Sequence, residues 1–204
     1  MVRGQPVAAD PIADPPSAVS AWNVANALTM FRLVLVPVFL LVLFHRGGHD
    51  TEWRIWAWVV FAVASVTDRF DGDLARKRGL VTEFGKLADP IADKALVVAA
   101  LIGLSLLHDL PWWVTVVIII REVGVTILRF WVIRHGVIAA SRGGKVKTLL
   151  QGVAIGLFVL PLTHELHEVA WVIMIAAIAV AMITGADYVA RAVRLRRAGR
   201  ASVA

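Results

Sequence analysis

Long apolar stretches alternate with short polar segments from residue 28 to residue 190. A membrane-spanning helix needs about 20 mostly apolar residues, and each stretch approaches this length. The pattern therefore predicts six transmembrane helices. Their expected ranges are 28–45, 54–75, 91–107, 112–134, 147–163 and 168–190. Residues 1–21 contain no apolar core of signal-peptide length, so we expect them to form a disordered tail.

The composition agrees with a membrane protein. Hydrophobic residues make up 59% of the chain and the mean hydropathy is +0.75, whereas soluble domains contain roughly 45–50% apolar residues. We therefore expect an all-α integral membrane protein with one domain over residues 22–195, followed by a basic C-terminal tail at 196–204. The absence of cysteine excludes disulfides, thiolate metal sites and a cysteine nucleophile.

Basic residues are distributed unequally between the two ends of the predicted bundle. The segments after the first, third and fifth stretches hold only Arg46 and Arg54. The other end holds most of the remainder, namely Arg76, Lys77, Arg78, Lys86, Arg134, Arg142, Lys145, Lys147, Arg191, Arg194, Arg196, Arg197 and Arg200. The positive-inside bias places that end and both termini in the cytoplasm. The net charge of +6 suits anionic headgroups or phosphates rather than nucleic acid.

Two carboxylates stand where the second apolar stretch ends. Asp68 and Asp71 are followed by Gly72, Ala75 and Arg76. Because successive residues of an α-helix are about 100° apart around its axis, these five positions share one face. The helix therefore presents two acids, two small residues and a guanidinium together.

The next helix adds a second pair of acids. Asp89 and Asp93 are four residues apart and so share a face. Four carboxylates near a membrane boundary would repel one another unless cations neutralised them, and all-oxygen ligands favour hard ions such as Mg²⁺ or Mn²⁺. The spacing therefore predicts a site for a pair of metal ions. Taken singly, Asp89 before Pro90 also suits a helix N-cap, and Asp68 also suits a helix-end charge that reaches water.

Together these residues form the pattern D-x2-D-G-x2-A-R-x8-G-x3-D-x3-D, in which the second glycine is Gly85. This pattern resembles the signature of the CDP-alcohol phosphotransferases without departure. The resemblance implies a multi-pass enzyme of the bacterial cell membrane with a six-helix catalytic domain and an active site at the cytoplasmic face. The implied reaction transfers the phosphatidyl group of CDP-diacylglycerol to an alcohol and releases CMP.

The same resemblance implies roles for the signature residues. Asp68, Asp71 and Asp89 are expected to bind two divalent cations, either Mg²⁺ or Mn²⁺. Asp93 is expected to be the general base and also a metal ligand. The expected nucleotide-binding residues are Asp68, Gly72, Ala75, Arg76 and Gly85. The resemblance also suggests a homodimer in contact with anionic membrane lipids.

Further segments resemble the branch of this family that uses glycerol 3-phosphate as the acceptor. They are `NALTMFR`, `IIIREVGVT`, `GGKVKTLLQ` and `ITGADYVARA`. A phosphate-bearing acceptor needs cations, and we expect Arg121, Lys145, Lys147 and Arg32 to bind it. Two alternatives stay open: Arg121 pairs with the adjacent Glu122 or another acid, and the two lysines are positive-inside anchors.

Other functions fit the sequence less well. Relatives that use phosphatidylglycerol (cardiolipin synthases) or inositol phosphate keep the same aspartates, so only the acceptor pocket distinguishes them. A cation-coupled transporter is expected to hold acids near the bilayer midplane and to have repeated halves. The acids of this chain instead gather at one cytoplasmic edge, and we see no internal repeat.

Overall fold

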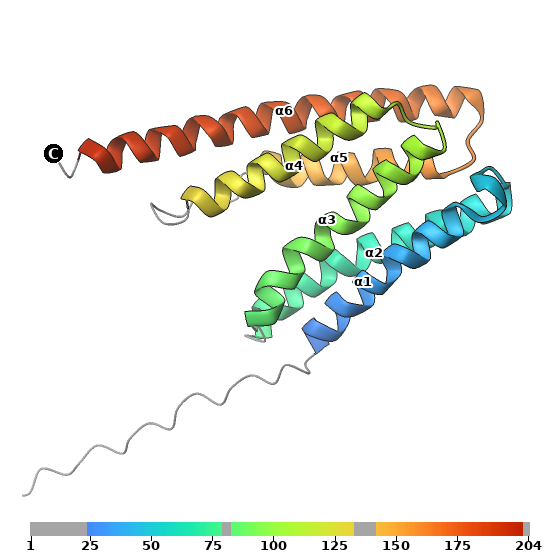
Figure 1. The fold of residues 1–204 in the computed structure, drawn as a ribbon, viewed down its shortest axis with the longest axis horizontal. Helices are drawn as coiled ribbons and strands as arrows, with labels where there is room; N and C mark the ends of the chain where they lie inside the picture. The colour runs from blue at the N-terminus through green and yellow to red at the C-terminus, as the bar shows by residue number, and fades with distance from the viewer. Residues whose placement is uncertain (1–23, 79–82, 133–141, 202–204) are drawn as a thin grey trace, which may run out of the picture.

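The described residues form a bundle of six α-helices and one short 3₁₀ segment (Figure 1). This computed structural model describes residues 24–78, 83–132 and 142–201, with side chains in the ranges 29–67, 94–128 and 143–194. The elements are α1 (Val24–Leu43), η1 (His45–Gly48), α2 (Thr51–Arg78), α3 (Glu83–Leu106), α4 (Trp112–Val132), α5 (Arg142–Val159) and α6 (His164–Ala201). The prediction of six helices is confirmed. The predicted tail at 1–21 lies outside the described residues.

Two helix boundaries differ clearly from the predicted spans. Helix α3 begins at Glu83, well before the predicted start at residue 91, so Asp89 lies inside the helix and is not its N-cap. Helix α6 continues to Ala201, through most of the basic segment after residue 195. Both extensions are polar, and an α-helix can continue where the apolar pattern of a membrane span has ended.

The helices alternate in direction, which gives the bundle two distinct ends. The turns that join α1 to α2, α3 to α4 and α5 to α6 lie at one end, at the right of Figure 1. The end of α2, the start of α3, the end of α4 and the end of α6 lie at the other. Helix α1 packs against α2 and α3, and α6 packs along α5 and α4.

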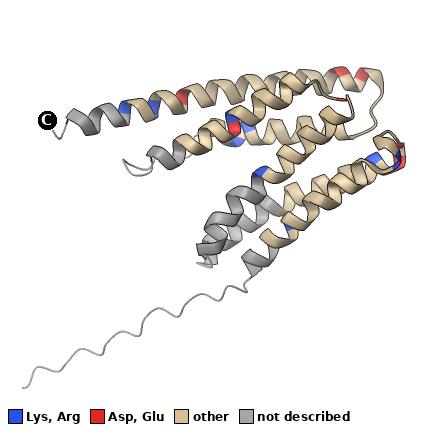
Figure 2. Cartoon of the chain, viewed as in Figure 1, with Lys and Arg blue, Asp and Glu red and all other residues tan. Residues whose placement is uncertain are grey.

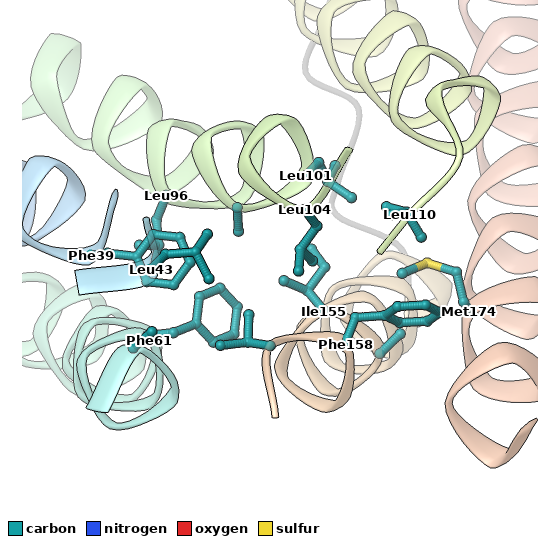
Figure 3. Close-up of a cluster of buried hydrophobic side chains, with 14 of the residues drawn as sticks. Phe39, Leu43, Phe61, Leu96, Leu101, Leu104, Leu110, Ile155, Phe158 and Met174 are labelled. Atoms are coloured by element: carbon teal, nitrogen blue, oxygen red, sulfur yellow. The ribbon is translucent and has the colours of Figure 1, made fainter. Parts of the chain in front are cut away.

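Among the described residues, a hydrophobic core joins all six helices (Figure 3). Its largest side chains are fully or almost fully buried, and they are Phe39, Leu43, Phe61, Leu101, Leu104, Ile155, Phe158 and Met174. Helices α1 and α3 approach closely at Gly103, where an added Cβ atom would lie 2.8 Å from Leu43 Cδ2. Glycine suits this position, because a larger residue would force the buried Leu43 side chain to shift.

The turn before α2 is fixed by its own sequence. Gly48 adopts φ +80°, and a Cβ atom at this position would collide with Leu107. Asp50 then caps α2, because its Oδ1 accepts hydrogen bonds from the backbone N–H groups of Glu52 at 3.1 Å and Trp53 at 3.2 Å. The glycine and the cap together set the point at which α2 starts.

A buried arginine ties this end of the bundle together. Arg54 donates through Nη1 to Asp109 Oδ2 at 2.6 Å and to the Gly48 carbonyl at 3.2 Å. Its Nη2 donates to the Phe158 carbonyl at 2.7 Å. The guanidinium thereby connects α2 with the 3₁₀ segment, the α3–α4 turn and the end of α5. Arg54, predicted to lie in a polar connection, is a buried structural residue.

We expect Arg54→Met to lower the free energy of unfolding by about 3 kcal/mol, because the change leaves Asp109 and the Phe158 carbonyl without their partner. Thermal unfolding of the purified protein in detergent measures the loss. Arg46→Gln is the matched control, since the exposed Arg46–Asp50 ion pair (3.6 Å) contributes at most about 1 kcal/mol. Equal melting temperatures for Arg54→Met and the wild type would contradict this assignment.

Charged positions gather at the turn between α1 and α2 and in a group on α4 and α5 (Figure 2). The side chains of this second group are largely buried, since those of Arg121, Glu122 and Lys147 are at most 13% exposed. Within the described residues, length and composition identify one helix able to cross a membrane, over His164–Arg194. Two shorter apolar helices are Thr29–Leu43 and Lys94–Leu106. The interior charges are therefore the unusual feature of an otherwise apolar bundle.

Candidate functional site

The signature residues lie on two consecutive helices. Asp68, Asp71, Gly72, Ala75 and Arg76 belong to the last part of α2, and Gly85, Asp89 and Asp93 belong to the first part of α3. Helix α2 ends at Arg78 and α3 begins at Glu83, so both segments lie at the same end of the bundle. Their side chains lie outside the described residues.

The donor set of these segments suits a divalent cation. Four aspartates provide only carboxylate oxygens, which are the preferred ligands of Mg²⁺ and Mn²⁺. The backbone brings the two carboxylate pairs to neighbouring helices. Among the described side chains, by contrast, no group of three or more His, Asp or Glu residues is suited to holding a metal. The α2–α3 end therefore carries the donor set of the chain that best suits a divalent cation.

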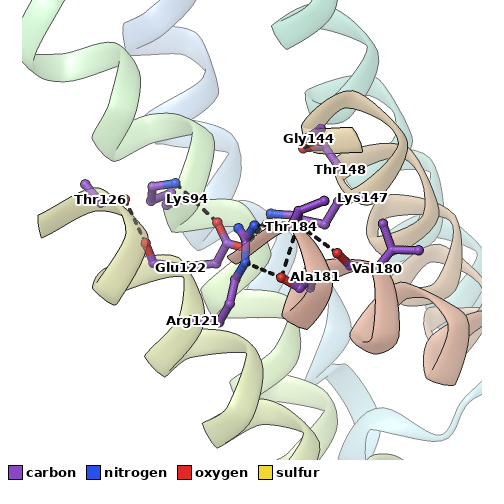
Figure 4. A network of polar contacts seen from close by, with 10 residues as sticks. All are labelled: Lys94, Arg121, Glu122, Thr126, Gly144, Lys147, Thr148, Val180, Ala181 and Thr184. Atoms are coloured by element: carbon purple, nitrogen blue, oxygen red, sulfur yellow. Dashed lines mark hydrogen bonds and ion pairs between the residues drawn. The ribbon is translucent and has the colours of Figure 1, made fainter. Parts of the chain in front are cut away.

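A polar cluster lies next to that segment, centred on Glu122 of α4 (Figure 4). Glu122 Oε1 accepts hydrogen bonds from Arg121 Nη1 at 3.1 Å and from Lys147 Nζ, and Oε2 accepts one from Lys94 Nζ at 3.3 Å. The four side chains come from α3, α4 and α5. Lys94 directly follows Asp93 in the sequence, so the cluster adjoins the last aspartate of the signature.

Arg121 extends the cluster to α6. Its Nε donates to the Ala181 carbonyl at 3.0 Å, and its Nη2 donates to Thr184 Oγ1 at 2.9 Å. Gly185 of α6 lies beside the guanidinium, and an added Cβ atom there would lie 3.5 Å from Arg121 Nε, at ordinary contact distance. The side chain of Arg121 is therefore held by three hydrogen bonds, two to α6 and one to Glu122.

Among the described side chains, the cluster carries more positive than negative charge. Three cations there contact one carboxylate, and the side chains of Lys147, Glu122 and Arg121 are only 7%, 9% and 13% exposed, while that of Lys94 is 31% exposed. A surplus of buried positive charge is costly in an apolar bundle unless an anion is bound beside it. The arrangement is therefore suited to binding an anionic group.

The four predicted acceptor-binding residues have different surroundings. Arg121 and Lys147 are both in the cluster, and the alternative that Arg121 pairs with Glu122 describes a contact that is present. Lys147 is buried and does not lie at the surface as an anchor would. Lys145 is exposed near the start of α5, and Arg32 is buried on α1. The structure thus brings two of the four together.

Two members of this region were not selected from the sequence as site residues. Lys94 looks like an ordinary charged residue beside the signature, and only the packing of α3 against α4 shows its contact with Glu122. Gln151 lies one helical turn after Lys147 and is 4% exposed, and its Oε1 has no hydrogen-bond partner among the described atoms. The sequence signal for this residue is a glutamine inside an otherwise apolar stretch, because a buried carboxamide normally has a hydrogen-bond partner.

Comparisons with known proteins agree with this picture. The family described as CDP-alcohol phosphatidyltransferase matches residues 22–183. A Mycobacterium tuberculosis protein named "probable phosphatidylglycerophosphate synthase" is 64% identical over 172 residues, which cover 84% of this chain and 82% of that protein.

Two more distant relatives carry another name, "CDP-diacylglycerol–glycerol-3-phosphate 3-phosphatidyltransferase". The Bacillus subtilis protein is 40% identical over 68% of this chain and 77% of its own length. The Escherichia coli protein is 41% identical over 66% of this chain and 75% of its own length. The family match spans most of the chain, including every residue of the aspartate signature. This chain is therefore a member of the CDP-alcohol phosphatidyltransferase family.

Proposed function

We propose that this protein transfers the phosphatidyl group of CDP-diacylglycerol to glycerol 3-phosphate, which gives phosphatidylglycerophosphate and CMP. The observation that carries the proposal is its 64% identity, over most of both chains, to a relative named as a phosphatidylglycerophosphate synthase. The buried, positively charged cluster beside the aspartate segment supports an acceptor that bears a phosphate.

The aspartates form the reaction centre in this proposal. Asp68, Asp71 and Asp89 bind two divalent cations, Mg²⁺ or Mn²⁺, and Asp93 is both a ligand and the general base. When bound, the cations neutralise charge on the diphosphate at the attacked phosphorus and on the departing CMP. Asp93 removes the proton of the acceptor hydroxyl as its oxygen attacks. Gly72, Ala75, Arg76 and Gly85, with Asp68, hold the nucleotide.

The acceptor phosphate binds at the polar cluster. Arg121 and Lys147 are its main ligands, because both head groups are already held at the cluster. Lys145 contacts the anion as it enters from the surface, and Arg32 contributes from α1. Lys94 belongs to the cluster and directly follows Asp93 on α3. A phosphate bound at the cluster is therefore close to the proposed general base. The remaining part of glycerol 3-phosphate then extends toward the aspartates.

The site lies at the cytoplasmic face of the cell membrane. We infer six spans with both termini in the cytoplasm, because basic residues concentrate at the end where α2 meets α3. Anionic lipid contacts the basic end of α6. A homodimer is part of the same proposal, on the basis of the family resemblance.

The proposed reaction is tested by measuring CMP release from CDP-diacylglycerol by the purified protein in detergent with Mg²⁺ or Mn²⁺. We expect release to depend on added glycerol 3-phosphate and to stop when a chelator removes the divalent cation. CMP release that is the same with and without glycerol 3-phosphate would contradict the proposed acceptor.

The assignment of the acceptor pocket makes a further prediction. Lys147→Gln is expected to raise the Michaelis constant for glycerol 3-phosphate by about tenfold, because a charge-assisted contact contributes about 1.5–3 kcal/mol. Arg121→Gln is expected to act in the same direction. The Michaelis constant for CDP-diacylglycerol is expected to change much less, since the aspartates and their metals hold that substrate.

Steady-state kinetics with each substrate varied in turn measures both constants. Arg46→Gln is the control, because it removes an exposed positive charge at the opposite end of the bundle. Equal increases for the two substrates in Lys147→Gln would argue against a separate pocket for the acceptor phosphate.

A further inference from the structure

One acid organises the proposed acceptor pocket. Glu122 contacts Lys94, Arg121 and Lys147, and among the described side chains it is the only carboxylate in ion-pair contact with any of these three cations. Its two oxygens are both used, since Oε1 accepts from Arg121 and Lys147 and Oε2 accepts from Lys94. Three helices therefore meet at one carboxylate.

The three cations do not depend on Glu122 equally. Arg121 is also held by the Ala181 carbonyl and Thr184 Oγ1 on α6. For Lys147, by contrast, Glu122 is the one hydrogen-bond acceptor among the described atoms, and the lysine is only 6% exposed. A buried ammonium group needs a fixed acceptor, so the position of Lys147 depends on Glu122.

We propose that Glu122 is a positioning residue, which fixes the ammonium group of Lys147 for contact with the acceptor phosphate. This inference rests on the proposed function. Glu122 does not touch the phosphate in this arrangement. It acts by holding Lys147 beside Arg121 and by reducing the repulsion between the three cations before the acceptor binds.

A glutamine cannot replace this carboxylate. The glutamine side chain has one acceptor oxygen, whereas both oxygens of Glu122 now accept hydrogen bonds from cations. The NH₂ group of glutamine would point its hydrogen atoms at one of these cations. Without the negative charge, Lys94, Arg121 and Lys147 repel one another. Both lysines have Glu122 as their one acceptor among the described atoms, but Lys94 is 31% exposed and can reach water, whereas Lys147 is buried and is expected to move most. We therefore expect the loss of Glu122 to act on acceptor binding through Lys147.

The test is a double-mutant cycle with Glu122→Gln, Lys147→Gln and the double variant, in which the Michaelis constant is measured for each substrate. We expect each single variant to raise the constant for glycerol 3-phosphate by about tenfold, with less than about a threefold change for CDP-diacylglycerol. The double variant should match Lys147→Gln within about twofold, because Glu122 then has no lysine to position.

Two results would overturn the proposal. The first is an additive effect, in which the double variant shows about a hundredfold increase for glycerol 3-phosphate. The second is an equal rise for both substrates in Glu122→Gln. The double variant loses one charge of each sign, so the net charge of the cluster does not change. It can therefore be compared with Lys147→Gln even if Glu122→Gln alone does not fold.

Asp109→Asn is the matched control, because it removes an acid that also pairs with a buried cation, Arg54, far from the cluster. It should lower the melting temperature without changing the ratio of the two Michaelis constants.

The wild-type data separate the two proposals. If the wild type converts glycerol 3-phosphate and the cycle is additive, only the role of Glu122 fails. If the wild type does not convert glycerol 3-phosphate, both proposals fail.

Discussion

Asp68→Ala, Asp71→Ala and Asp89→Ala are each expected to lower turnover by about 10³-fold or more, because each removes a proposed ligand of the divalent cations. The cations stabilise charge on the diphosphate by several kcal/mol, and each 1.36 kcal/mol corresponds to a tenfold change in rate. The bundle should remain folded, since removing one of several mutually repelling carboxylates relieves repulsion. Activity measured across a titration of Mg²⁺ or Mn²⁺ tests each variant.

Asp73→Ala provides the matched control for these variants. Asp73 belongs to the same helix and stands next to Gly72, but at about 100° per residue it lies on a different face from Asp68 and Asp71. It should retain most of the activity and the metal response of the wild type. Wild-type turnover and metal response in any of the three signature variants would contradict the assignment of that residue as a ligand.

Asp93→Asn is expected to lower kcat by about 10²-fold to 10⁴-fold, which is the usual contribution of a general base. The amide keeps the size of the carboxylate but cannot take the proton of the acceptor hydroxyl. Binding of CDP-diacylglycerol should change little, because the other three aspartates are unchanged. Equilibrium binding of CDP-diacylglycerol, measured together with kcat, separates loss of chemistry from loss of substrate.

A metal titration identifies the contribution of Asp93 as a ligand. If the residue acts mainly as the base, saturating Mg²⁺ or Mn²⁺ will not restore turnover to Asp93→Asn. Recovery to near the wild-type rate at high metal concentration would assign Asp93 to metal binding alone and would place the general base elsewhere.

The number and order of the helices could be predicted from the sequence because apolar length is a strong signal. The residues at which the helices begin and end were harder to predict. The segment before residue 91 is polar and contains Pro90, yet α3 already begins at Glu83. Likewise, α6 runs on to Ala201 through a basic segment that no longer looks like a membrane span. Where polar residues continue a helix, the apolar pattern gives no information about its end.

The aspartate signature was available from local spacing, because Asp68 and Asp71 share one face of a single helix, as do Asp89 and Asp93. The cluster around Glu122 could not be predicted from local spacing. Its members Lys94, Glu122 and Lys147 come from three helices, and only the packing of α3, α4 and α5 brings them together. The sequence suggested the pair of Arg121 and Glu122 only as one alternative, since adjacent residues give no information about their tertiary partners.

A competition between acceptors tests the central claim most directly. The purified wild-type protein is given CDP-diacylglycerol, a divalent cation and equal concentrations of glycerol 3-phosphate, inositol phosphate and phosphatidylglycerol, and the lipid formed is identified by mass spectrometry. We expect phosphatidylglycerophosphate to be the main product. The cations of the acceptor pocket favour a phosphate monoester over phosphatidylglycerol, and the sequence identity on which the proposed function rests favours glycerol 3-phosphate over inositol phosphate. Cardiolipin or a phosphatidylinositol phosphate as the main product would contradict the proposed function.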